Sequence, residues 1–118
     1  MSTTVVNVRV KHIRPQYQDL KSWMADPQNE YIGRGGVLII DKARFPLRDS
    51  PLANPFKAGR DGTLEEVLTN YKIYIDDLIE SGVISQEYLR SLKGKRLGCW
   101  CCPAPCHGNI VKDIVDRL

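Results

Sequence analysis

The pattern of apolar and polar positions predicts short strands near both ends of the chain and one strong helix between them. Thr3–Val10 predicts a strand, because its valines partly alternate with polar residues. Leu64–Glu80 predicts a helix, since Thr63 and Glu66 form a capping box ahead of an apolar face at helical spacing. The weaker patterns predict a helix over Gln16–Met24, strands over Glu30–Arg34 and Val37–Ile40, a Ser85-capped helix over Gln86–Leu92, a strand over Arg96–Cys101 and a final helix over residues 110–118.

The segment between these elements, residues 41–62, is rich in proline and glycine and predicts one long structured loop. Phe45, Leu47, Leu52 and Phe56 indicate that this loop packs against the core. Strands that alternate with helices favour an α/β layer fold. We therefore expect a single domain over residues 1–118, a small Rossmann-like three-layer fold with a short, largely parallel sheet.

Composition and charge narrow the class of protein. The 118 residues are 42% hydrophobic and 26% charged, which is globular rather than disordered composition. The chain shows no secretory signal pattern and no run of about 18 apolar residues, so we expect a cytoplasmic or host-intracellular protein without membrane contact. Residues 1–60 carry ten Lys/Arg against five Asp/Glu. This excess favours an anionic small-molecule ligand, with nucleic acid as an alternative, and leaves the oligomeric state undetermined.

All four cysteines fall within the last strand and the start of the last helix: Cys99, Cys101, Cys102 and Cys106, the last followed by His107. Strand alternation places Cys99 and Cys101 on one face and Trp100 on the other. A Pro-rich turn then delivers Cys106-His107-Gly108-Asn109 to a helix N-terminus. Such an N-terminus binds anions and lowers a thiol pKa. Cys106 is therefore a candidate nucleophile, His107 its proton partner, and Gly108 and Asn109 candidate ligand-binding residues.

Two other interpretations of this cluster stay open. Cys99, Cys101, Cys106 and His107 are zinc-ligand types, although their spacing differs from paired zinc knuckles. Cys99 and Cys101 are also plausible as core residues, because free cysteine is among the most buried residue types. A vicinal Cys101–Cys102 disulfide would be strained, and we discount it.

Two motifs earlier in the chain are candidate contributors to the same site. Arg34 ends a predicted strand and precedes Gly35, so its planar guanidinium is held beside a flexible backbone that a phosphate could approach. Asn54 begins an Asn-Pro-Phe turn, where its amide either caps the local backbone or faces a base or sugar.

These motifs together resemble a known family. The chain carries Tyr31-Ile32-Gly33-Arg34, Asn54-Pro55-Phe56, Gly98-Cys99-Trp100-Cys101 and Cys106-His107-Gly108, and in this combination it resembles the domain of unknown function 4326. The resemblance runs from about Val5 to the last helix and implies a viral, phage or bacterial origin, but no established reaction. The family pattern commonly continues with Asp, where this chain has Asn109, so a mechanism that needs a carboxylate there is in doubt.

The leading hypothesis is a domain that binds a nucleotide-like or phosphate-bearing ligand through Arg34, Gly35, Asn54 and the Cys106-His107-Gly108-Asn109 helix start. Whether Cys106 also catalyses a reaction stays open. The alternative hypothesis is a non-enzymatic module of viral or mobile-element origin, with or without zinc, that docks on a protein or nucleic acid.

Overall fold

The computed structural model describes residues 2–101 and 104–118. Within these residues the elements follow the order β1 (Thr4–Asn7), α1 (Val10–Ile13), α2 (Leu20–Ala25), β2 (Asn29–Tyr31), β3 (Leu38–Ile40), β4 (Ala43–Phe45), α3 (Leu64–Glu80), α4 (Gln86–Ser91), β5 (Arg96–Cys99) and α5 (His107–Asp116). The mixture of helices with a parallel sheet confirms the α/β class. None of the described helices combines the length and apolar character that a bilayer crossing requires.

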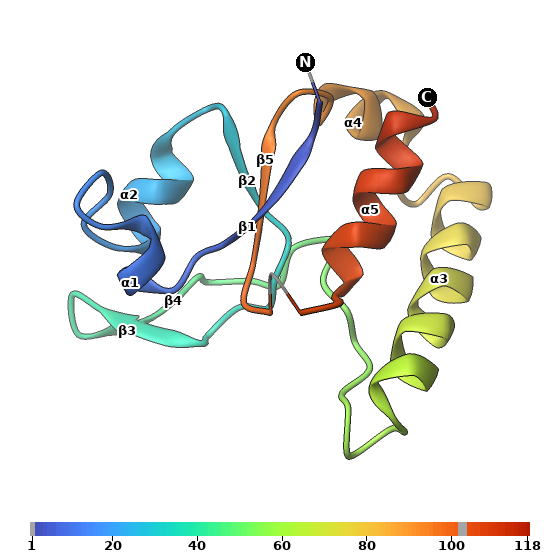
Figure 1. The fold of residues 1–118 in the computed structure, drawn as a ribbon, viewed down its shortest axis with the longest axis horizontal. Coiled ribbons are helices and arrows are strands. Elements are labelled where there is room, and N and C mark those ends of the chain that lie inside the picture. The colour runs from blue at the N-terminus through green and yellow to red at the C-terminus, as the bar shows by residue number, and fades with distance from the viewer. Residues whose placement is uncertain (1, 102–103) are drawn as a thin grey trace.

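The parallel sheet organises the described part of the molecule. It has the order β1-β5-β2, and β5 pairs in parallel with both neighbours, so that Thr4 and Asn29 both lie beside Arg96. Parallel neighbours require crossovers, and here the crossovers carry the helices. Figure 1 shows α1 and α2 on one side of the sheet and α3 and α5 on the other.

Two apolar clusters fill the space between the sheet and these helices. One contains Leu97 and Cys99 of β5 together with buried residues of α3, α4 and α5. The other lies on the opposite face and includes Trp23, with Trp100 packed against it. The alternation predicted for the last strand is therefore confirmed for Leu97, Cys99 and Trp100. Gly98 faces the cluster that contains Trp23, and an added Cβ at Gly98 would lie 2.5 Å from the Trp23 ring.

Several predicted boundaries are confirmed and others shift. The α3 helix matches its prediction at both ends, and the Thr63–Glu66 capping box is present. Ser85 caps α4 by accepting from the Tyr88 N–H. The strand predicted to reach Val10 ends at Asn7 instead, because the Asn7 side chain accepts from the Arg9 N–H and turns the chain into α1.

Four further elements differ from their predicted boundaries. The helix predicted from Gln16 begins at Leu20, after a capping box between Asp19 and Ser22. The strand predicted from Glu30 to Arg34 covers Asn29–Tyr31, the one predicted to Cys101 ends at Cys99, and α5 begins three residues earlier than predicted.

The region predicted as one long loop contains a strand. Ala43–Phe45 pairs antiparallel with Leu38–Ile40 as a hairpin, and its turn places Asp41 and Lys42 at φ of 53° and 65°. Glycine or asparagine usually occupies such turn positions, so the sequence carried no strong hairpin signal. The remaining loop does pack down at Leu52, which is fully buried, whereas Leu47 is 89% exposed, contrary to its prediction as a packed residue.

Candidate functional site

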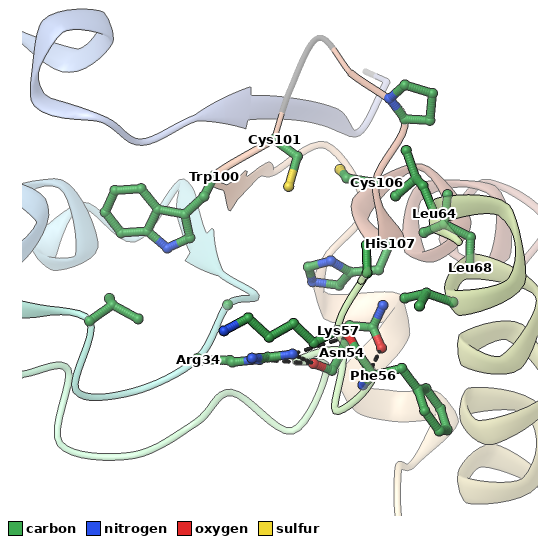
Figure 2. Close-up of a pocket in the computed structure, with 15 residues that line it drawn as sticks. Arg34, Asn54, Phe56, Lys57, Leu64, Leu68, Trp100, Cys101, Cys106 and His107 are labelled. Carbon is green, nitrogen blue, oxygen red and sulfur yellow. Dashed lines mark hydrogen bonds between the residues drawn. The ribbon is translucent and has the colours of Figure 1, made fainter. Parts of the chain in front are cut away.

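A cavity of about 390 Å³ opens beside the carboxyl ends of the parallel strands. Its walls come from four parts of the chain: the segment after β2, the turn at residues 54–58, the first turns of α3, and residues 100–101 and 105–107 near the start of α5. Figure 2 shows Arg34 and Lys57 on one side of this space and the sulfur atoms of Cys101 and Cys106 on another. Parallel α/β sheets commonly bind ligands at this edge.

Arg34 is anchored at the cavity wall by its own hydrogen bonds. Its Nε and Nη2 donate to the Asn54 carbonyl oxygen at 3.0 and 2.9 Å, and Nη2 also donates to the Phe56 carbonyl at 3.1 Å. The guanidinium therefore holds the Asn-Pro-Phe turn against the end of β2. In the described part of the chain its second terminal nitrogen, Nη1, forms no hydrogen bond, so this donor remains available on a fixed cation.

Asn54 both caps its turn and lines the cavity. Its Oδ1 accepts from the Phe56 N–H at 2.9 Å, which is the local capping role considered for this residue. The Nδ2 group points away from that bond (Figure 2). Asn54 therefore presents a donor to the cavity while its acceptor holds the turn.

Lys57 adds a second cation to the same wall. Its backbone N–H donates to Asp61 Oδ2 at 2.8 Å, which ties down the turn that carries it. The exposed side chain runs beside Arg34 in Figure 2. In the described structure its Nζ takes part in none of the ion pairs, so its charge is not neutralised by a neighbouring carboxylate.

Cys106 is the N-cap of α5 and is 3% exposed, yet it borders the cavity. Its Sγ lies 3.2 Å from the Sγ of Cys99, at the end of β5. This sulfur contact and, to a smaller extent, the N–H groups of Gly108 and Asn109 lower the pKa of Cys106 to about 7. Burial opposes the shift but does not cancel it. A substantial thiolate fraction at neutral pH follows.

His107 is held apart from Cys106, although the two are adjacent in sequence. Its Nε2 lies 2.7 Å from the Ile32 carbonyl oxygen, and its ring packs edge-on against Tyr71 with centroids 5.2 Å apart. Burial lowers the pKa of His107. A neutral imidazole that donates from Nε2 keeps Nδ1 as an acceptor. No hydrogen bond of the described residues joins His107 to Cys106, so the structure does not pair them as nucleophile and base.

Three further predicted ligand-binding residues do not line the cavity. Gly108 is buried, and an added Cβ would lie 2.9 Å from Val5 Cγ1 and 3.3 Å from Ile32 Cδ1. Its missing side chain therefore brings the helix start onto the sheet rather than admitting a ligand. Asn109 is exposed at the first turn of α5. Gly35 also lies outside the cavity lining, and its backbone N–H donates to Asp49 Oδ1 at 2.7 Å.

The candidate zinc ligands are not gathered into one site. Cys99 is buried as predicted, whereas Cys101 lies beyond the strand and is exposed, contrary to its prediction as a core residue. His107 is directed to Ile32. In the described ranges no group of three or more His, Cys, Asp or Glu side chains has the arrangement of a metal site. Cys102, and with it the Cys101–Cys102 pair and part of the Pro-rich turn, lies outside the described residues.

The sequence patterns missed Trp100 as a site residue. Its Nε1 donates to the Tyr31 hydroxyl at 2.8 Å, and that hydroxyl donates to the Arg34 carbonyl at 2.7 Å. Strand alternation placed Trp100 only on the face opposite Cys99, but it is half-buried and lines the cavity. Its position immediately after a strand, next to Cys101, was the available signal. The two hydrogen bonds fix the backbone that carries the Arg34 side chain.

The apolar wall was also missed, because its residues match the core-facing pattern of a helix. Leu64 and Leu68 belong to the apolar face predicted for the Leu64–Glu80 helix, but both line the cavity, and Leu64 is 44% exposed. Phe56 lines the cavity from the facing turn. The arrangement combines two cations, a neutral imidazole and a low-pKa thiol with aromatic and aliphatic surface. Chemically, this set suits an anion that carries an apolar or aromatic part.

Comparison with known proteins places the chain in a family without a described activity. Residues 16–117 match the family model called domain of unknown function (DUF4326). The chain is 44% identical over 61 residues to the "Uncharacterized 12.4 kDa protein in nrdA-td intergenic region" of Enterobacteria phage T4. That alignment covers 51% of this chain and 56% of the phage protein. No solved structure matches the chain significantly. The family match confirms the resemblance, and the chain belongs to the family of domain of unknown function 4326.

Proposed function

We propose that this protein binds a small phosphate-bearing, nucleotide-like ligand in the cavity beside the start of α5. The observation that carries the proposal is the pairing of Arg34 and Lys57 on one wall of a mainly apolar cavity of about 390 Å³. That volume falls within the roughly 300–1,000 Å³ of small-molecule sites. In the described structure neither cation forms an ion pair, although Asp61 lies near enough to Arg34 for the guanidinium to lower the pKa of that carboxyl. The cations therefore leave positive charge at the cavity wall, which favours an anionic ligand.

The two cations differ in their proposed roles. Arg34 is already oriented by its bonds to the Asn54 and Phe56 carbonyls, so its remaining nitrogen offers a fixed donor to a phosphate oxygen. Lys57 is exposed and flexible, and it adds charge rather than geometry. Binding energy that depends on Arg34 is therefore expected to be sensitive to ligand shape. Binding energy that depends on Lys57 is expected to be sensitive mainly to ligand charge and salt.

The aromatic surfaces account for the nucleotide-like part of the proposal. Phe56 and Trp100 line the cavity, and Trp100 is oriented by its bond to Tyr31. Aromatic faces stack on nucleobases with little sequence preference. The Asn54 Nδ2 group supplies a donor for a base or sugar acceptor. We also propose that the fold is a minimal Rossmann-like three-layer domain, which is supported by helices on both faces of the parallel sheet and a cavity at its carboxyl edge.

Cys106 extends the proposal from binding to chemistry. Its pKa of about 7 gives a thiolate fraction at neutral pH, and it borders the cavity. If a bound ligand carries an electrophilic centre, the Cys106 thiolate is the proposed nucleophile, and it needs no base within the protein once it is deprotonated. The proposed binding of the ligand does not depend on this nucleophilic step.

Isothermal titration calorimetry with purified protein tests the proposal by measuring the Kd of each ligand. The ligands are nucleoside 5′-monophosphates and diphosphates, the corresponding nucleosides, and inorganic phosphate. We expect at least one nucleotide to bind more tightly than its nucleoside. Lys57→Ala is expected to raise its Kd about 3- to 10-fold, as for loss of one partly exposed charge contact.

Lys11→Ala is the matched control, because Lys11 is an exposed lysine on α1, away from the residues that line the cavity. It should leave the Kd unchanged. Equal binding of nucleotide and nucleoside, or an equal loss of affinity in both lysine variants, would contradict the proposed cation site. No binding by any member of the panel would remove the nucleotide-like ligand class.

A further inference from the structure

We propose that Cys99 and Cys106 are a redox-active thiol pair that forms a reversible intramolecular disulfide by exchange with small-molecule disulfides. The two sulfur atoms already lie 3.2 Å apart, and both residues are almost fully buried. A disulfide needs an S–S distance of about 2.05 Å, so closure requires a movement of about 1 Å. This inference concerns a modification of the site and does not depend on the proposed ligand.

The surroundings assign different roles to the two sulfurs. Cys106 borders the cavity, whereas Cys99 lies behind it in the core formed by β5 and α5. Of the two paired sulfurs, Cys106 is therefore the one that a small disulfide in the cavity reaches first. The lowered pKa of Cys106 also makes it the better attacking thiolate. Cys101 also lines the cavity, but partial burial of its thiol raises its pKa and makes it the weaker nucleophile.

The exchange has two steps. The Cys106 thiolate attacks one sulfur of a small disulfide RSSR, the Cys106–SR bond forms, the RS–SR bond breaks, and the released RS⁻ takes up a proton. The Cys99 thiol then loses its proton and attacks the Cys106 sulfur, which forms the Cys99–Cys106 bond and expels the second RS⁻, again protonated by solvent. In total, two protein thiols are oxidised by two electrons and one RSSR is reduced to two RSH.

The position of the pair makes the bond suited to reversal. The two cysteines are seven positions apart, so the disulfide closes a short loop and constrains the unfolded chain less than a long one does. A disulfide that adds little stability is more readily reduced. The bond also removes the Cys106 thiolate from the cavity wall, and it ties the end of β5 to the start of α5.

Peptide mapping of the wild-type protein tests the inference directly. The folded protein is incubated with oxidised glutathione, blocked with N-ethylmaleimide and digested with trypsin and chymotrypsin. Cleavage at Trp100 separates Cys99 from the other cysteines. We expect a loss of two hydrogens from the intact mass before blocking, and a Leu97–Trp100 peptide linked to the peptide that holds the other three cysteines. Fragmentation of the linked peptide should place N-ethylmaleimide on Cys101 and Cys102 and none on Cys106. Dithiothreitol should restore both free peptides.

Single substitutions distinguish the order of the steps. Cys99→Ala should accumulate a glutathione adduct on Cys106, because the resolving thiol is absent, and Cys106→Ser should leave Cys99 reduced. Cys101→Ser and Cys102→Ser are matched controls that should retain the linkage. The inference is overturned if wild-type Cys99 is recovered unlinked after oxidation, or if Cys99 still becomes linked in Cys106→Ser. The wild-type result stands even where a variant fails to fold.

Discussion

Replacing Arg34 with methionine should loosen the turn that forms one wall of the cavity. Methionine retains most of the apolar stem but removes all three hydrogen bonds from the guanidinium to the Asn54 and Phe56 carbonyl oxygens. A hydrogen bond from a charged group contributes about 1.5–3 kcal/mol. Here two of the three bonds share one carbonyl, and the arginine is only half-buried, so we expect a combined loss of about 2 kcal/mol in the free energy of unfolding.

Urea denaturation followed by tryptophan fluorescence measures this loss. With a slope of about 2 kcal/mol/M, the midpoint should fall by about 1 M. Arg44→Met is the matched control, because Arg44 is exposed and donates a single bond to the Gly36 carbonyl at 2.9 Å. Its expected loss is within about 0.5 kcal/mol. Hydrogen exchange should show the Phe56 amide losing protection in the Arg34 variant only. Equal losses in the two variants would refute the anchoring role.

Three further predictions use other parts of the structure. Gly98→Ala should lower the free energy of unfolding by about 2–3 kcal/mol in a urea titration, because the new Cβ would lie 2.5 Å from the Trp23 ring and 2.6 Å from Val8 Cγ1; a neutral effect would contradict this packing. Thr63→Ala should cost about 1 kcal/mol by removing the α3 cap, with thermal unfolding as the measurement and an unchanged Tm as the contrary result. The rate of Cys106 alkylation should rise with pH around a midpoint near 7. Because folding lowers the pKa of this thiol from 9.0, the free energy of unfolding should increase from pH 7 to pH 9. This contribution to stability should be lost as the pH falls through 7. An alkylation midpoint near the ordinary thiol value would contradict the sulfur contact.

The elements that sequence pattern predicted best are those whose signals are local. The helix Leu64–Glu80 has its capping box and its apolar spacing within one segment, so both ends were predictable. The alternation at Leu97, Cys99 and Trp100 likewise depends only on strand geometry. Boundaries failed where a side chain competed with the pattern, as Asn7 did at the end of β1. The hairpin turn at Asp41 and Lys42 adopts positive φ without glycine, and no local rule indicates it.

The candidate site divides in the same way. Residue order alone was enough to place a thiol and an imidazole at a helix start, Arg34 at a strand end before glycines, and Asn54 at the head of a turn. It was also enough to assign the chain to its family. The partners of these side chains came from the folded arrangement. It paired Cys106 with Cys99 and His107 with Ile32, and it turned Gly108 toward the sheet. The physical reason is that residue type and spacing set what a side chain can do, whereas the packing of α5 on the parallel strands sets which atoms come within bonding distance.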